Sequence, residues 1–371
     1  MNILISCCAA LEAAQAMALG LAKGLADNGV GVWALLSSRV SNKKAWEADP
    51  RITCVYIDTI LDSKERLSKE IKFSLVERGR VRKAFKGICF DFVIHPMPHR
   101  WEKRINRLVN KDKTLVTVHD PVHHSGTSKR IERMQNAFVE MADGVIVLTE
   151  SFVDSVSSIY GINADRVIYI PLGNLTPEEQ DGVKSPVSYR PDAYNFLFFG
   201  RICEYKGLDV LSKAYAKLAV EYADISLTVV GNGDFSRYQN EYAALPNCTI
   251  VNRYIEDAEI PKLFDGENLI LLLPYLDATQ SGVIPTALSR GVPIIASNAG
   301  GLSEQLAGGK YGALVSSGVV DGLYEAMRRV VSDPSYYASL KECSARGGSV
   351  HSWSAIGRQL LGKLREFNIR K

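Results

Sequence analysis

Short apolar runs alternate with longer helical patterns along the first half of the chain. Each run is too short for anything but a buried strand. A helix rich in Ala and Leu, Leu11–Asn28, follows the first run and ends at Gly29. Such alternation is typical of a parallel sheet with helices on both faces. The predicted strands are Asn2–Ser6, Gly31–Leu36, Ile52–Ile57, Phe92–His95, Leu115–His119 and Gly144–Leu148.

The same alternation restarts after a linker, Ile168–Asp192, that is rich in Gly, Asn, Pro and acidic residues. A final helix, Ser354–Asn368, has no strand of its own, and we expect it to pack back on the first domain. We therefore predict two Rossmann-like domains that face each other across a cleft with the ligand between them. The first comprises 1–172 with 353–371, and the second comprises 190–352. The second contains a helix and five strands: Leu208–Tyr222, and Phe196–Gly200, Ser226–Gly231, Thr249–Val251, Leu269–Leu273 and Pro293–Ala296.

Composition places the chain among ordinary cytoplasmic proteins. Its 371 residues suffice for two full cores, and 46% apolar with 23% charged residues is usual for such domains. The seven cysteines show no CxxC or Cys/His metal spacing, which predicts reduced intracellular thiols. No apolar segment reaches the ~20 residues needed to cross a bilayer. The start, MNILISCC, is a strand without a preceding basic region, so we do not interpret it as a signal peptide.

Positive charge is concentrated between Lys64 and Lys113. This window holds fifteen Lys and Arg against six Asp and Glu, a net charge of +9, while the whole chain carries +3. One interpretation is a solvated helix face, in which Glu65, Glu70 and Glu77 pair with the cations. The other is a patch that faces an anionic surface. Aromatic residues are sparse and no nucleic-acid module is present, so a membrane, on the inner face, is the favoured partner over nucleic acid.

The stretch Pro274–Glu304 carries the first candidate chemistry. A buried strand leads into a polar turn, Asp277–Gly282, and then into a short helix, Val283–Arg290, that Gly291 and Pro293 bring to an end. A strand, a polar turn and a helix start form a place where an α/β sheet binds an anion. An ordinary β-α-β unit with small turn residues is the alternative.

Two cations follow the first strand of the second domain. Arg201 and Lys206 lie in the loop at its carboxyl end, the edge that faces the predicted cleft. Opposite the start of the Val283–Arg290 helix, they predict a diphosphate site. The alternative is that both are solvated loop residues.

The motifs of this domain resemble those of a known family. FGRICEYKGLDVLSKAY, VVGNGDF, TQSGVIPTALSRGVPIIASNAGGLSEQL and YGALV resemble, in order and spacing, the GT-B glycosyltransferases of family 4, in a branch that bears TQSGV. The resemblance covers the whole second domain. It implies the α/β GT-B fold, in which the second domain binds a nucleotide diphosphate sugar and the first binds the acceptor.

The resemblance also implies roles for individual residues. Arg201 and Lys206 would hold the donor diphosphate, and His119 would face the donor sugar from the first domain. Backbone N–H groups near Ser281 would approach the diphosphate. The full set of implied donor-binding residues is Gly200, Gly231, Gly233, Tyr254, Ile255, Thr279, Gln280, Ser281, Gly282, Val283 and Thr286.

The chain departs from the family at two positions. Alignment through Ala287, Gly291 and Pro293 puts Ala278 and Thr286 where the family usually has two Glu, one on the donor sugar and one on the ribose. Thr286 can bond a ribose hydroxyl, whereas Ala278 offers no polar side chain. Gln280 or Thr279 is a candidate substitute. The loop after the first strand, Ser6–Glu12, also lacks the family's Gly-rich turn.

Histidines gather at strand ends of the first domain. His95 and His99, with Asp120, are candidates for the acceptor side; a capped strand end and a surface position are the alternatives for the two histidines. His119, His123, His124 and Asp120 suggest a metal at first sight. Because His123 and His124 are adjacent they tend to point apart, and the chain has no DxD pair, so we predict no metal and no cofactor.

The resemblance implies a retaining, metal-independent hexosyltransferase of bacterial surface polysaccharide synthesis. Its donor is a UDP- or GDP-hexose and its acceptor a saccharide or polyprenyl-diphosphate-linked glycan. Two alternatives stay open. A nucleotide-sugar 2-epimerase needs acid/base carboxylates, which the pattern lacks. A non-catalytic nucleotide-sugar-binding subunit is consistent with the missing Glu pair.

Overall fold

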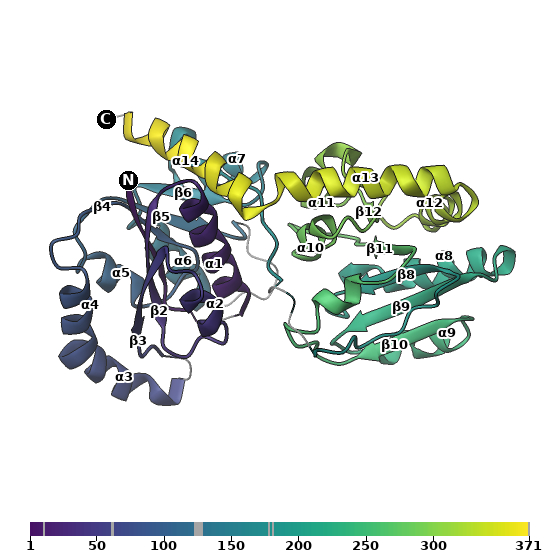
Figure 1. Cartoon of the computed structure of the whole chain (residues 1–371), viewed down its shortest axis with the longest axis horizontal. Coiled ribbons are helices and arrows are strands. Elements are labelled where there is room, and N and C mark those ends of the chain that lie inside the picture. Colours follow the sequence, from purple (N-terminus) through teal and green to yellow (C-terminus); the bar gives the residue numbers. More distant parts are fainter. Residues whose placement is uncertain (10–11, 61–62, 122–128, 177–178, 180–181, 370–371) are drawn as a thin grey trace. The chain divides into compact units, whose positions relative to one another are not determined.

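The computed structural model describes the chain except residues 10–11, 61–62, 122–128, 177–178, 180–181 and 370–371. The chain folds into two compact units (Figure 1). Unit 1 comprises Met1–Gly173 and Ser352–Lys371, and unit 2 comprises Asn174–His351. Each has its own hydrophobic core, centred on residues such as Leu4 and Val116 in unit 1 and Leu271 in unit 2.

The core of unit 1 is a parallel sheet of seven strands in the order β3-β2-β1-β4-β5-β6-β7. Apolar strands such as β6 are buried along their whole length, as expected when helices cover both faces. The strand order reverses between β1 and β4, so the loops that follow these two strands begin side by side. The strands are β1 Asn2–Cys7, β2 Gly31–Ser37, β3 Ile52–Ile57, β4 Phe90–His95, β5 Lys111–Val118, β6 Gly144–Val147 and β7 Val167–Tyr169.

The last helix, α14 (Trp353–Ile369), packs against α1 (Glu12–Asp27), as Figure 1 shows. The Asn28 side chain donates a hydrogen bond to the Ser354 carbonyl at 2.9 Å. A Cβ at Gly357 would lie 2.2 Å from the Gly24 carbonyl oxygen, so the two helices cross at backbone contact. The prediction that the C-terminal helix returns to the first domain is confirmed. The other helices of unit 1 are α2 Lys43–Glu47, α3 Arg66–Lys72, α4 Arg78–Ala84, α5 Glu102–Asn106, α6 Lys129–Val139 and α7 Phe152–Tyr160.

Unit 2 contains a second parallel sheet, of six strands in the order β10-β9-β8-β11-β12-β13. The order reverses between β8 and β11, which places the loops after these strands together. The strands are β8 Tyr194–Phe199, β9 Ile225–Gly231, β10 Cys248–Asn252, β11 Leu269–Leu273, β12 Ile294–Ser297 and β13 Ala313–Val315. The helices are α8 Leu208–Glu221, α9 Gln239–Ala243, α10 Val283–Ser289, α11 Gly301–Gln305, α12 Val320–Ser332 and α13 Pro334–Val350.

Two Rossmann-like sheets confirm the predicted α/β class. Most predicted strands agree with the structure to within two residues, although β5 begins four residues earlier, at Lys111. The structure adds β7, which the sequence pattern assigned to the linker, and β13. No helix among the described residues has the length and apolar character needed to cross a membrane.

Candidate active site

The loop after β8 positions the two predicted cations. A single 3-10 turn, Glu204–Lys206, follows Arg201, and Gly207 ends it with φ +68°. A Cβ at Gly207 would lie 1.9 Å from the Pro274 carbonyl oxygen, so only glycine allows this approach to the segment after β11. The Leu276 N–H donates to the Tyr205 carbonyl at 2.7 Å and joins the two loops. Arg201 and Lys206 therefore stand beside Pro274–Gly282 at the switch point of the sheet.

Tyr275 connects Lys206 to the start of α10. The Lys206 ammonium lies 3.5 Å from the centre of the Tyr275 ring, and the Tyr275 hydroxyl lies 3.4 Å from Ser281 Oγ. Tyr275 itself is fully buried. Burial, with a smaller effect from the charge of Arg201, lowers the pKa of Lys206 to about 8. The sequence pattern included Tyr275 in its key stretch but gave it no role.

The backbone at Ser281 is already engaged. Gln305 accepts a hydrogen bond from the Ser281 N–H at 2.7 Å and donates one to the Ser281 carbonyl at 3.0 Å. The Val283 N–H approaches Ser281 Oγ at 3.4 Å, and the Gly282 N–H donates to no described atom. Of the three N–H groups that the resemblance implies, Gly282 is thus the most available. Because α10 has only seven residues, we attribute the positive charge of this site to the side chains of Arg201 and Lys206 rather than to the start of the helix.

Gly231 and Gly233 let the β8 and β9 loops touch. A Cβ at Gly231 would lie 1.8 Å from the Gly200 carbonyl oxygen, and one at Gly233 would lie 2.1 Å from that of Ile202. The Asn252 side chain holds Gly233 through its N–H at 3.3 Å and its carbonyl at 3.1 Å. Beyond Asn252, the side chain of Tyr254 is half exposed and that of Ile255 is buried. These contacts give the two glycines a packing role at the implied nucleotide border.

The two residues that stand where the family has its Glu pair already form hydrogen bonds within the protein. Ala278 is buried, and its carbonyl accepts from the Gly301 N–H at 3.0 Å. The buried Thr286 hydroxyl lies 3.1 Å from both the Asn174 carboxamide oxygen and the Thr176 hydroxyl. Gln280 Oε1, in contrast, is a buried acceptor without a hydrogen-bond partner among the described residues, whereas Thr279 is half-buried. Of the two candidate substitutes, Gln280 is thus the one with an unsatisfied buried acceptor.

In unit 1, His119 and Asp120 lie directly after β5. The His119 Nε2–H donates to the Pro96 carbonyl at 2.9 Å, which leaves Nδ1 as the acceptor of the neutral ring. Burial lowers the pKa of His119 and favours that neutral form. One carboxylate oxygen of Asp120 is buried without a partner among the described residues. Each residue thus offers one acceptor atom at the carboxyl end of β5.

A buried carboxylate, Glu102, organises the loops after β1 and β4. It accepts hydrogen bonds from the Ser6 hydroxyl at 2.5 Å and the Cys8 N–H at 2.8 Å, and lies 2.9 Å from His95 Nδ1. Burial opposes ionisation, but the charge and hydrogen bond of His95 outweigh it and lower the pKa of Glu102. His95 is fully buried, so it lies behind the expected acceptor surface rather than on it. The sequence gave no signal for Glu102, because Ser6 and Cys8, two of its three partners, are more than ninety residues away along the chain.

His99 is half-buried and belongs to the only group among the described residues with metal-ligand proximity. The ligand atoms of Cys8, His99 and Glu102 lie within 4.8 Å of one another. Both Glu102 oxygens already accept hydrogen bonds, and burial raises the pKa of the Cys8 thiol well above its usual value. This group therefore fits a buried hydrogen-bonded cluster better than a metal site. His123 and His124 lie outside the described residues.

Comparisons with known families cover both units. A model described as glycosyl transferases group 1 matches residues 193–333, and a model described as Glycosyltransferase Family 4 matches residues 14–173. A D-inositol 3-phosphate glycosyltransferase of Paenarthrobacter aurescens is 25% identical over 375 residues, which cover 93% of this chain and 91% of that protein.

Solved structures match over the full length. Sucrose-phosphate synthase from Thermosynechococcus elongatus superposes with a TM-score of 0.68 at 19% identity and covers 100% of both chains. Anabaena Alr3699/HepE in complex with UDP and glucose gives a TM-score of 0.66 at 17% identity and covers 99% of this chain and 100% of that one. At these identities the two structures are evidence for the fold alone.

Proposed function

The chain belongs to the group 1 glycosyltransferases of family 4 and has their GT-B fold, and we propose that it moves a hexose from a nucleotide diphosphate sugar with retention and without a metal. The proposal rests mainly on the surroundings of the Lys206 ammonium. The ammonium is largely removed from water, over an aromatic ring, and forms no ion pair with a described carboxylate. A cation in this position is costly unless an anion joins it. The donor diphosphate supplies that anion.

Arg201 completes the anion site. Its guanidinium donates to the Tyr205 hydroxyl at 3.2 Å, so it is held in the same loop without a carboxylate partner among the described residues. In the proposed reaction the bond from the sugar C1 to the diphosphate oxygen breaks, and the electron pair moves onto the diphosphate. Arg201 and Lys206 stabilise that charge as it develops. The acceptor oxygen bonds C1 on the same face and passes its proton to the departing diphosphate.

The residues at the two donor-facing positions cannot act as nucleophiles, which fits this route. The donor-facing positions that carry Glu elsewhere in the family are Ala278 and Thr286 here, and neither can form a glycosyl ester. Gln280 and the Nδ1 atom of His119 are the proposed acceptors for hydroxyls of the donor sugar. Asp120 and His99 are the proposed acceptor-side residues, supported by their position at the strand ends of unit 1.

For the substrates we propose a UDP- or GDP-hexose and a saccharide or polyprenyl-diphosphate-linked acceptor, used at the inner face of the membrane in surface polysaccharide synthesis. Support for UDP comes from the structure of Anabaena Alr3699/HepE, which is a complex with UDP and glucose. A phosphorylated polyol is the second acceptor class. It is favoured by the name of the Paenarthrobacter relative and by the basic surface of unit 1.

The direct test is a transfer assay with candidate nucleotide sugars, selected by thermal shift. Arg201→Ala and Lys206→Ala are each expected to lower kcat/KM at least ~100-fold, the loss expected for one removed contact to developing charge. Lys213→Ala, an exposed cation on α8, is the matched control and should leave activity unchanged. EDTA should also leave it unchanged, since side-chain cations neutralise the leaving group.

Each alternative outcome has its own product pattern. Variants within a few-fold of the wild type would contradict the site, and a loss that magnesium restores after EDTA would contradict metal independence. Isomerised nucleotide sugar formed without acceptor would indicate an epimerase. A thermal shift with no product, for every donor and acceptor tested, would indicate a binding subunit.

A further inference from the structure

One helical segment of unit 1 turns apolar side chains toward solvent. Residues 66–84 run continuously through α3, a π-helical turn at Phe73–Glu77, and α4. The inner face buries Phe73 and Val81 in the core, together with Phe85 just beyond the helix. Leu67, Ile71 and Leu75 are 76%, 52% and 78% exposed. They precede inner-face positions by two residues, or about 200° of helix, and so point away from the core.

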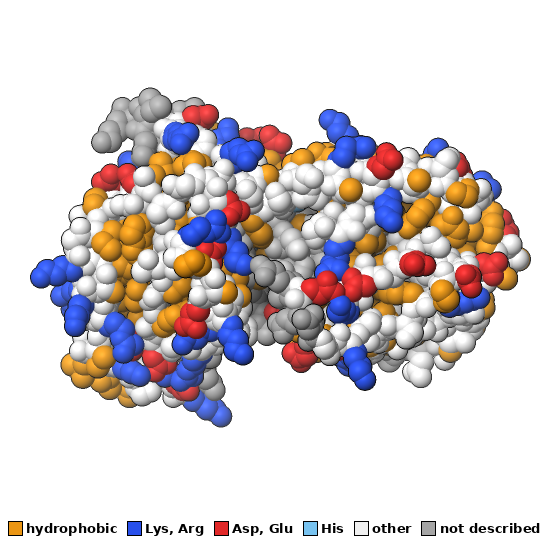
Figure 2. All heavy atoms as spheres, in the orientation of Figure 1, with side chains coloured by type: hydrophobic (Ala, Val, Ile, Leu, Met, Phe, Trp, Pro, Cys, Tyr) orange, Lys and Arg blue, Asp and Glu red, His pale blue; other side chains and the backbone are white. Residues whose placement is uncertain are grey.

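The exposed face continues as a row of cations. Arg78, Arg82 and Lys86 follow Leu75 at helical spacing, with Lys83 beside them, and all four are exposed. Figure 2 shows the surface hydrophobic side chains over the α3–α4 region with Lys and Arg side chains next to them. Apolar and cationic residues thus share one outward face, which we call the outer face.

The nearby glutamates do not neutralise this row. Glu65 pairs with Arg39 at 2.8 Å, and Glu70 pairs with Arg104 and, at 3.1 Å, with Arg100. Glu77 is buried and pairs with Arg80 at 3.2 Å. No ion pair with a described carboxylate involves Arg78, Arg82, Lys83 or Lys86. The pairing that the sequence left open is therefore formed in part, by Glu70 and Glu77, but it does not include the cation row.

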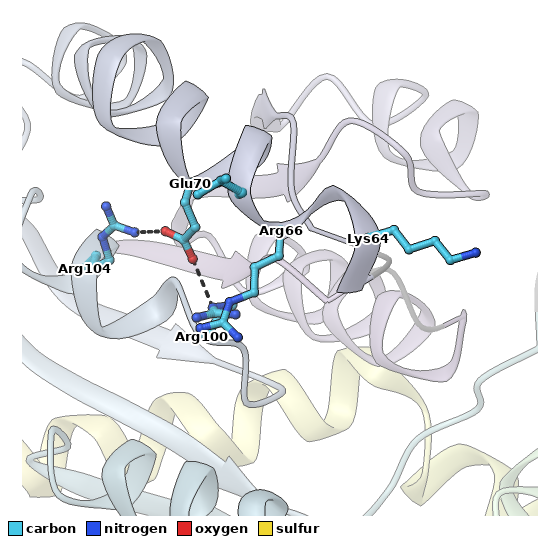
Figure 3. Close-up of a pocket in the computed structure, with 6 residues that line it drawn as sticks. Lys64, Arg66, Glu70, Arg100 and Arg104 are labelled. Carbon is cyan, nitrogen blue, oxygen red and sulfur yellow. Dashed lines mark hydrogen bonds and ion pairs between the residues drawn. The ribbon is translucent and has the colours of Figure 1, made fainter.

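A basic pocket adjoins the apolar end of the outer face. Its volume is about 650 Å³, and Lys64, Arg66, Leu67, Glu70, Arg100 and Arg104 line it. Figure 3 shows Glu70 between Arg104 and Arg100, with the Arg66 guanidinium beside that of Arg100. Three arginines lie around one carboxylate, whereas the Lys64 side chain points away from it in Figure 3. The excess of positive charge suits a phosphoryl group. Leu67 belongs to both features and joins them.

A lipid surface fits this combination better than a nucleic acid does. Phe73, Phe85 and Trp101, the aromatic residues around the outer face, are buried, so they cannot stack on bases. An exposed apolar row gains nothing from a phosphate backbone. Interfacial helices, in contrast, combine an apolar row with flanking Lys and Arg.

We propose that the outer face docks unit 1 on a membrane that contains anionic phospholipids. Leu67, Ile71 and Leu75 enter the headgroup region, the cation row faces the anionic headgroups, and the pocket holds one lipid phosphate. The proposal rests on the proposed function only in that a lipid-linked acceptor gives docking its purpose. Vesicle binding itself requires no sugar transfer.

The test is sedimentation of the full chain with phosphatidylcholine vesicles, with and without phosphatidylglycerol, at low and high salt. The wild type should bind the anionic vesicles at low salt and be largely released at high salt. The triple change Leu67→Ser, Ile71→Ser, Leu75→Ser should lower partitioning at least ~10-fold, since most of the inserted apolar area is lost. Arg78→Gln with Arg82→Gln and Lys86→Gln should remove the salt-sensitive part, and Arg66→Gln should weaken binding to the anionic vesicles alone.

Val220→Ser and Lys213→Gln are the matched controls. Both residues are exposed on α8 of unit 2, Val220 at 87%, and their changes should leave partitioning unaltered. Unchanged circular dichroism and an unchanged thermal shift by UDP show that each variant folds. A wild type that stays in the supernatant at low salt overturns the proposal. Retention of vesicle binding by the triple variant also overturns it. If the triple variant still binds vesicles but loses a self-association that the wild type shows in solution, the outer face joins two copies of the chain instead.

The two proposals fail separately. If vesicles do not bind but UDP stabilises the protein and a sugar reaches a soluble acceptor, the docking proposal falls and the transferase proposal stands. If vesicles bind as expected but no nucleotide shifts the melting temperature, the donor site falls and the docking surface stands. Capture of single-stranded RNA in place of vesicles overturns the membrane assignment.

Discussion

At the scale of single residues, Lys206 predicts a pH dependence. Its pKa is lowered to about 8, so the free enzyme loses this positive charge as the pH rises through that value. Because kcat/KM reports the free enzyme, kcat/KM for the donor should fall above pH ~8 and be level below it on account of this group. Lys206→Arg should remove the fall even if it lowers the plateau, since arginine stays charged. A decline that persists in Lys206→Arg would assign the titration to another group.

His119 predicts a separation of turnover from nucleotide affinity. Its Nε2–H is held by the Pro96 carbonyl, and only Nδ1 remains to accept a hydroxyl of the donor sugar. His119→Ala should lower kcat for the nucleotide sugar while the Kd for free UDP, measured by calorimetry, stays within a few-fold. His119→Asn, which keeps an acceptor, should recover part of kcat. An equal loss of affinity for free UDP would place His119 on the nucleotide instead.

The sequence predicted residues whose role follows from strand-end position, and missed those whose role follows from tertiary contact. Arg201 and Lys206 follow a recognisable strand, so their common loop could be inferred. Tyr275 packs against Lys206, and Gln305 forms hydrogen bonds with Ser281. The spacing of these residues in the sequence does not predict either contact. Glu102 is the extreme case, since it is 96 residues from Ser6 along the chain.

At the scale of elements, the crossing of α1 and α14 makes a testable pair of glycines. A Cβ at Gly357 would lie 2.2 Å from the Gly24 carbonyl oxygen, whereas one at Gly362 on the same helix meets nothing within 4 Å. Gly357→Ala should destabilise by ~1–3 kcal/mol through overpacking, and Gly362→Ala should stabilise by up to ~1 kcal/mol through helix propensity. Urea denaturation of both variants decides this. Equal midpoints would mean that α14 shifts freely on α1.

Element prediction succeeded for strands of four residues or longer and missed the two three-residue strands, β7 and β13. β7 has three residues and a proline soon after, so its last two residues were assigned to the linker that was predicted to begin at Ile168. For the charged segment the sequence left two alternatives open. Spacing allows Glu65, Glu70 and Glu77 to pair with cations on their own helix, but only Glu77 does; the partners of Glu65 and Glu70 lie on other elements. Sequence spacing cannot choose between a local partner and one brought close by the fold.

At the scale of the whole molecule, two separate cores predict stepwise unfolding. The cluster around Leu271 belongs wholly to unit 2, and those around Leu4 and Val116 belong to unit 1. Multidomain chains with independent cores commonly depart from a two-state transition. We therefore expect differential scanning calorimetry to resolve two transitions, one for each unit.

Two perturbations assign the transitions. UDP bound on unit 2 should raise only that unit's transition, by about 2.7 kcal/mol of stability at ~100 times its Kd. Gly357→Ala should lower only the transition of unit 1, because both helices at that crossing belong to it. With UDP and Gly357→Ala together the two transitions should therefore move apart. One transition that both perturbations shift would mean that the units unfold as one body, and that α14 transmits stability across the chain rather than closing unit 1 alone.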